Sequence, residues 1–189
     1  NSFRMDLTPF IKPGQENILA VRLDTENWDS RWYPGAGIYR HVWLVKTNAV
    51  HVGHWGTYIT TPTITDKSAL VKLAVTVDNK TNKKVNAVVR TSLYELDINN
   101  KPTAKVATTK ESILELKPGS SMVSQAEVAV ANPKRWDVIS PNRYVAQTSI
   151  TINGKIVDTY NTPFGIRTIE FSATKGFLLN GKKVVIKGT

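Results

Sequence analysis

The sequence contains no cysteine among its 189 residues. This absence excludes a disulfide framework, metal sites built from thiolates and a cysteine nucleophile. The G-x-S-x-G elbow that carries the nucleophile of many serine hydrolases is absent as well. The core of the folded protein must therefore be held together by packing alone.

Long apolar runs and long helical periodicity are also missing. No apolar run reaches the length of a membrane-spanning helix, and the first residues lack the charged and apolar pattern of a secretory signal. We therefore expect no membrane partner. The sequence leaves the compartment open, with a periplasmic or secreted location as a first expectation.

Acidic residues are fewer than basic ones, with 15 Asp and Glu against 25 Lys and Arg, and the formal net charge is +10. A face that binds nucleic acid would gather its cations among interleaved aromatic rings. Here the lysines gather in predicted turns, such as the turn with Lys80, Lys83 and Lys84. Lysines in turns are typical of a solvated surface, so we predict no nucleic-acid partner.

Alternation of apolar and polar residues takes the place of helical periodicity, and such alternation is typical of β-strands. The alternating segments are Ile18–Leu23, Ile38–Val45, Val50–Ile59, Leu70–Val77, Asn86–Leu96, Ser112–Leu116, Met122–Val130, Tyr144–Ile152 and Lys155–Tyr160. Turn sequences rich in Asn, Gly and Pro separate them. About seven strands at this spacing between residues 48 and 168 predict an all-β fold with an antiparallel β-sandwich.

The last stretch, "GFLLNGKKVVIKGT" at residues 176–189, matches a phosphate-binding loop at all but one position. Such a loop needs a Ser or Thr hydroxyl for Mg²⁺ where this chain has Lys183, and a helix must follow it. Here a β-branched run at residues 184–186 follows instead. Because an Asn-Gly pair at residues 180–181 is a strong turn signal, we predict a β-hairpin and no nucleotide site.

Residues that could carry catalysis are scarce. On the strand that we expect for His51 and His54, positions three apart point to opposite faces, so we predict no metal site. Glu95 and Asp97 are expected on one face of a strand, whereas a retaining glycosidase needs two carboxyl groups that flank a bond from two sides. We therefore predict no catalytic residue and no cofactor in this sequence.

Aromatic residues are concentrated in one segment, "NWDSRWYPGAGIYRHVWLV" at residues 27–45, where Asp29 and Arg31 lie close to Trp32. A carbohydrate site needs aromatic faces for the C–H surfaces of a sugar and charged groups for its hydroxyls. A packed aromatic corner of a sandwich is the alternative interpretation. The residues by themselves leave both open.

Three motifs follow one another along the chain: "SRWYPGAGIYRHVWL", "NPKRWDVISPNRY" and "TPFGIRTIEFSATKGFLLNGKKVVIKG". The first resembles the end of the sugar-binding-like jelly-roll domain of glycoside hydrolase family 2, particularly in its β-galactosidases. The second resembles a segment late in the family's immunoglobulin-like domain. The third resembles the linker and the first hairpin of its (β/α)₈ barrel. The resemblance covers essentially the whole chain.

The resemblance implies a division into three parts. Residues 1–47 would be the C-terminal part of the jelly-roll domain, residues 48–168 an immunoglobulin-like β-sandwich, and residues 169–189 the linker and first hairpin of the barrel. It also implies a retaining glycoside hydrolase whose catalytic glutamates lie in the barrel, outside this sequence. The chain would then be a non-catalytic segment that braces the barrel, inactive by itself.

The implied partners are a carbohydrate, a β-galactoside bound through the parent enzyme, and the barrel of the same chain. The match to the first motif implies that Asp29, Arg31 and Trp32 line the sugar pocket. A β-glucuronidase or β-mannosidase is the alternative parent, and a free-standing carbohydrate-binding or adhesion module is the alternative of a different class. The sequence leaves open whether the chain forms a homo-oligomer.

Overall fold

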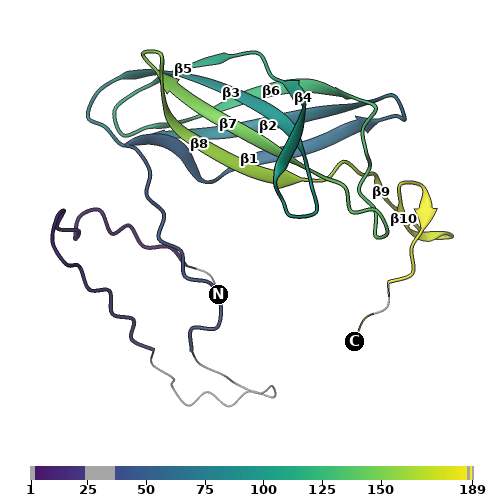
Figure 1. Ribbon diagram of the computed structural model, residues 1–189, viewed down its shortest axis with the longest axis horizontal. Helices are drawn as coiled ribbons and strands as arrows, with labels where there is room; N and C mark the ends of the chain where they lie inside the picture. Colours follow the sequence, from purple (N-terminus) through teal and green to yellow (C-terminus); the bar gives the residue numbers. More distant parts are fainter. Residues whose placement is uncertain (1–2, 24–36, 187, 189) are drawn as a thin grey trace. The chain divides into compact units, whose positions relative to one another are not determined.

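Antiparallel strands make up the regular structure of the chain, shown in Figure 1 as a computed structural model that describes residues 3–23, 37–186 and 188. The strands are β1 (Val50–Ile64), β2 (Ser68–Asn79), β3 (Val85–Leu96), β4 (Pro102–Thr108), β5 (Ser112–Leu116), β6 (Ser121–Ala131), β7 (Arg143–Ile152), β8 (Lys155–Phe164), β9 (Ile169–Ser172), β10 (Gly176–Leu179) and β11 (Lys182–Lys183). The described residues contain no helix, and so none that could cross a membrane. The predicted all-β fold class is confirmed.

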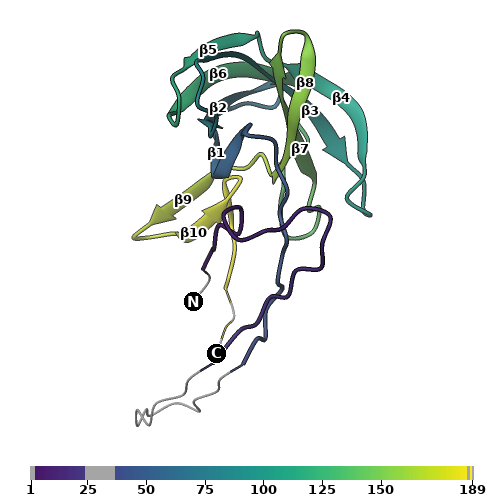
Figure 2. The same cartoon turned by 90° about the vertical axis from the view of Figure 1, so that its left-hand side faces the viewer.

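Two sheets form the sandwich, which Figure 2 shows from a second side. One sheet has the strand order β1-β2-β6, and the other has the order β4-β3-β7-β8 with β5 also paired to β3. Alternation along β2 explains why the sheets pack on each other. Val71, Val75 and Val77 point inward and are buried, while Lys72 between them points outward.

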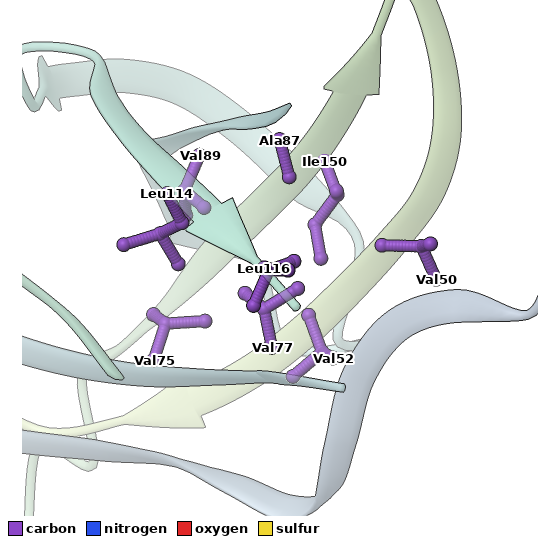
Figure 3. Packing of buried hydrophobic residues seen from close by; sticks show 9 residues of the cluster. All are labelled: Val50, Val52, Val75, Val77, Ala87, Val89, Leu114, Leu116 and Ile150. Carbon is purple, nitrogen blue, oxygen red and sulfur yellow. The ribbon is translucent and has the colours of Figure 1, made fainter. Parts of the chain in front are cut away.

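The core between the two sheets consists of two clusters of buried side chains. In Figure 3, the first cluster joins residues of both sheets: Val50, Val52, Val75, Val77, Ala87, Val89, Leu114, Leu116 and Ile150. The second cluster contains Leu93 and Tyr144, each at most 1% exposed. Burial of aliphatic and aromatic side chains is the main favourable term in folding, and it acts here without any disulfide.

Residues 1–45 form a unit separate from residues 46–189. The strands predicted at Ile18–Leu23 and Ile38–Val45 are absent, since the structure assigns neither segment to a strand. Their apolar side chains are exposed, as are 87% of Ile18 and 78% of Trp43. A strand forms only where a neighbouring backbone completes its ladder of hydrogen bonds, and no described segment pairs with either. For these two segments the alternation was a wrong prediction of a sheet.

The predicted hairpin at the end of the chain is present. β10 pairs with β11, and Asn180 and Gly181 between them have φ angles of 52° and 76°, as a two-residue type I′ turn requires. The linker before the hairpin forms β9, which was not predicted. It pairs with the other side of β10, so the end of the chain is a three-stranded sheet of order β11-β10-β9.

Candidate functional site

The three residues predicted to bind sugar, Asp29, Arg31 and Trp32, lie outside the residues that the structure describes. Of their aromatic segment, residues 37–45 are described, and all of them are exposed. Tyr39 and Trp43 are two exposed aromatic side chains of this part. The sugar-binding role of Asp29, Arg31 and Trp32 stays a prediction.

The histidines of the sandwich do not form a catalytic or metal site. His51 is buried, with its Nε2 4.0 Å from Oδ2 of Asp78, and its Nδ1 has no hydrogen-bond partner. Ser121 donates its hydroxyl to Oδ1 of Asp78 at 2.6 Å, so this hydroxyl is bound to a carboxylate instead of to an imidazole base. His54 stacks on Trp55 with ring centroids 4.7 Å apart. Within the described part of the chain, no three His, Asp or Glu side chains could hold a metal ion.

The two carboxylates considered from the sequence have local structural partners. Oε2 of Glu95 lies 2.7 Å from Nζ of Lys134, and the hydrogen bond to this carboxylate raises the pKa of the Lys134 ammonium. Asp97 follows the end of β3, and its Oδ1 accepts the backbone N–H groups of Asn99 at 2.9 Å and Lys101 at 2.8 Å. These contacts fit an exposed ion pair and a capped turn.

A cluster of side chains lies where the chain leaves the sandwich for the last hairpin, and we call it the joint: Trp136, Gly165, Arg167, Thr168 and Asn180. The backbone N–H of Trp136 donates to the carbonyl oxygen of Ile166 at 2.9 Å. The guanidinium of Arg167 lies over the indole ring of Trp136, 5.1 Å from its centroid. A Cβ atom at Gly165 would lie 3.0 Å from Cβ of Trp136, so glycine permits this close approach.

Asn180 connects the hairpin turn to the sandwich through its side chain. Its Nδ2 donates to the carbonyl oxygen of Trp136 at 2.9 Å, and its Oδ1 accepts the N–H of Thr168 at 3.0 Å. Its own backbone N–H donates to the carbonyl oxygen of Thr168 at 3.0 Å. One side chain therefore fixes the turn to both the linker and the segment between β6 and β7.

Tyr144 anchors the segment that carries Trp136. The phenol oxygen accepts the backbone N–H of Lys134 at 2.8 Å, and the ring packs against Phe164 with centroids 5.7 Å apart. Burial raises the pKa of Tyr144, which keeps the phenol neutral well above neutral pH. A neutral, buried phenol with a fixed partner has a structural role and is a poor proton-transfer group.

An apolar groove of about 330 Å³ opens beside the joint. Its lining consists of Trp136, Val138, Arg167, Ile169, Phe177, Leu179, Val184 and Ile186. Apolar side chains of this groove are exposed, 64% for Val138 and 73% for Ile186. The lining includes one cation and no carboxylate, so it lacks the acid and base of glycoside hydrolysis. An exposed apolar patch of this kind is typical of a surface that packs against protein.

Two of the three motifs quoted from the sequence meet at the joint. Trp136 belongs to the second motif, and Gly165, Arg167 and Asn180 belong to the third. The contacts among these residues were not predicted from the sequence. Asn180 was assigned only to a turn, because an Asn-Gly pair signals backbone geometry and says nothing about what the amide will bind.

We expect Asn180→Ala to lower the free energy of unfolding of the hairpin by about 1–3 kcal/mol more than a matched substitution, because it leaves two backbone groups, the carbonyl of Trp136 and the N–H of Thr168, without their side-chain partner. The matched variant is Asn153→Ala. Asn153 also precedes a glycine in a hairpin turn with a φ angle of 49°, but its side chain has no hydrogen bond in the described structure. Amide hydrogen exchange over residues 168–183 measures the difference. Equal effects of the two substitutions would contradict the connecting role of Asn180.

Comparison with known proteins places these features among related chains. The sequence profile described as "Glycosyl hydrolases family 2" matches residues 50–167. Beta-galactosidase BoGH2A of Bacteroides ovatus is 42% identical over 188 residues, covering 99% of this chain and 21% of that protein. A putative beta-glucuronidase of Formosa agariphila is 31% identical over 99% of this chain and 17% of its own length.

A solved structure shows the same fold. The crystal structure of a glycosyl hydrolase family 2 member from Bacteroides cellulosilyticus has 31% sequence identity and a TM-score of 0.64, over 72% of this chain and 17% of that one. The chain thus spans about a fifth of the length of the curated relatives that it matches.

Proposed function

The chain belongs to family 2 of the glycosyl hydrolases, and on this basis we propose that it is the non-catalytic middle segment of a retaining hydrolase that acts on β-galactosides. The observation that carries the proposal is the 42% identity to a β-galactosidase over nearly all of this chain. The groove beside the joint also supports a non-catalytic segment, because no carboxylate lines it.

The groove beside the joint supports a bracing role toward the catalytic barrel. Val138 and Ile186 expose apolar surface there, and the connection through Asn180 holds the hairpin in one position on the sandwich. A barrel that follows the hairpin would cover this apolar surface. Burial of the surface would hold the barrel in a fixed position against the sandwich, instead of leaving it free to move on a linker. The pocket role of Asp29, Arg31 and Trp32 is part of the same proposal and rests on the first motif.

A β-glucuronidase parent is the second candidate, since several relatives carry that name at 25% to 31% identity. A β-galactoside and a β-glucuronide differ in the configuration of the C4 hydroxyl and in the C6 group, which is a hydroxymethyl group in one and a carboxylate in the other. A pocket distinguishes the carboxylate through a cation such as arginine.

We expect the 189-residue chain to release no chromophore from a chromogenic β-galactoside, because it lacks the two opposed carboxylates of retaining hydrolysis. The full-length enzyme should hydrolyse the β-galactoside faster than the matching β-glucuronide and β-mannoside. Initial rates with the three substrates at equal concentration give the comparison. Turnover by the 189-residue chain, lost on substitution of one of its carboxylates, would overturn the non-catalytic assignment. Faster hydrolysis of the glucuronide would replace the β-galactoside assignment with the second candidate.

A further inference from the structure

A hollow lies on the outer face of the five-stranded sheet, above Val145 of β7. Tyr144 and Ala146 belong to the core, so alternation along the strand directs Val145 to the opposite face. Val145 is nevertheless only 5% exposed. In register it lies between Tyr94 of β3 and Pro163 of β8. An outward valine that water hardly reaches is the floor of a concave site.

The hollow has a volume of about 380 Å³, which is within the range of sites for small molecules. Its lining residues come from four strands and one turn: Leu96, Asn100, Pro102, Arg143, Val145, Asn161 and Pro163. The floor is therefore aliphatic and pyrrolidine surface, while the rim carries one guanidinium and two amides. This mixture suits a ligand with C–H faces and polar edges.

Arg143 is held in place by a pre-formed turn. Asn100 has a φ angle of 61°, and the hydrogen bonds of Asp97 to Asn99 and Lys101 fix the turn around it. The guanidinium of Arg143 donates to Oδ1 of Asn100. This contact uses one of the five N–H groups of arginine and orients the rest of the fork.

Arg143 has no carboxylate partner within the described residues, unlike other arginines of the sandwich. Arg90 lies 3.6 Å from Glu111, and Arg135 lies 2.7 Å from Asp66. The carboxylate of Asp97, in the turn next to Asn100, is not part of the lining and accepts two backbone N–H groups. Arg143 is the one charged side chain of the lining, so the lining complements an anion.

Asn161 supplies a further donor on the opposite side of Val145. Its Oδ1 accepts from Nε2 of Gln147 at 3.4 Å, and its Nδ2 has no acceptor within the described part of the chain. Gln147 and Asn161 are paired in register on the same outer face as Val145 and Pro163. The guanidinium of Arg143 and the amide donor of Asn161 thus lie on two sides of the apolar floor at Val145.

We propose that this hollow binds a saccharide that carries a carboxylate. Arg143 pairs with the carboxylate through its free N–H groups, Asn161 donates to a hydroxyl, and the ring face of the sugar lies on Val145 and Pro163. None of its lining residues belongs to the joint. It requires no catalysis by the parent enzyme, so it can be correct or wrong independently of the proposed function.

Titration of the ¹⁵N-labelled chain with methyl β-D-glucuronide, followed by NMR, tests the site. We expect chemical-shift changes at the backbone amide of Val145, at the backbone amides of the residues next to Pro163, and at the side-chain amide of Asn161. Methyl β-D-glucoside, which lacks the carboxylate, should bind at least about tenfold more weakly than the glucuronide. The Arg143→Ala variant should lose affinity for the glucuronide by a similar factor. The control variant Arg90→Ala removes another arginine from the same face of the sheet and should bind the glucuronide with unchanged affinity.

Three results would overturn the inference. The first is equal binding of glucuronide and glucoside with no effect of Arg143→Ala, which removes the role of the carboxylate. The second is that sodium acetate at the same ionic strength reproduces the full set of shifts, which reduces the site to an ion pair. The third is the absence of shifts around Val145 at saturating glucuronide, with the folded spectrum retained.

Discussion

The Leu93→Ala variant is expected to lose about 3–5 kcal/mol of the free energy of unfolding. Leu93 is 0% exposed and belongs to the second core cluster with Tyr144 and Ile166. Removing its side chain costs the transfer of the lost methyl and methylene groups and leaves a cavity between the sheets that the surrounding strands can close only in part. Urea unfolding followed by tryptophan fluorescence measures the loss.

The matched control is Ile113→Ala on β5, because Ile113 is an aliphatic residue of the same sheet that is 72% exposed. It should change stability by roughly 0.5 kcal/mol or less, as is usual for surface positions. Similar losses for the two variants would mean that Leu93 is not at the centre of a packed core and that the sandwich assigned here is wrong.

The Arg31→Ala variant of the full-length enzyme is expected to lower kcat/KM by about tenfold or more, at roughly 1.4 kcal/mol for each factor of ten. This follows from the proposal that Arg31 reaches the sugar pocket of the barrel. There its guanidinium would bind a sugar hydroxyl or orient an acidic group. Arg31→Lys should not restore the rate, because an ammonium cannot reproduce the planar, bidentate geometry of guanidinium. Steady-state kinetics on a chromogenic β-galactoside and the melting temperature of each variant are the measurements.

The competing interpretation is that Arg31 pairs with Asp29 and stiffens its own turn, as local ion pairs often do. The control is Arg40→Ala in the same aromatic segment. The guanidinium of Arg40 lies over the ring of Tyr39, 5.6 Å from its centroid, so this variant removes an arginine that has a local contact. A lower melting temperature for Arg31→Ala with normal kinetics of the folded fraction would assign Arg31 to structure and remove it from the pocket.

The site at the joint shows why its residues were only partly predictable. Trp136 and Tyr144 stood out in the sequence because their motif resembles a family segment, and Asn180 stood out because of the glycine that follows it. Their contacts were not predictable, since Trp136 and Asn180 are far apart in the chain and their hydrogen bond depends on how the linker folds back. Strand β9 was missed for the same reason, because its pairing partner β10 decides that it is a strand.

The sequence by itself determined the all-β class, the absence of disulfides and thiolate sites, and the hairpin at Asn180, because these depend on local alternation, composition and turn chemistry. The tertiary structure alone decided which alternating segments became strands: β2 pairs with a strand on each side, whereas Ile18–Leu23 pairs with none of the described residues. It also decided that Val145, outward by alternation, would be nearly buried beneath Arg143 and its neighbours. Hydrogen-bond partners and concave surfaces arise between residues distant in the chain, and a local pattern carries no information about which distant residues will meet.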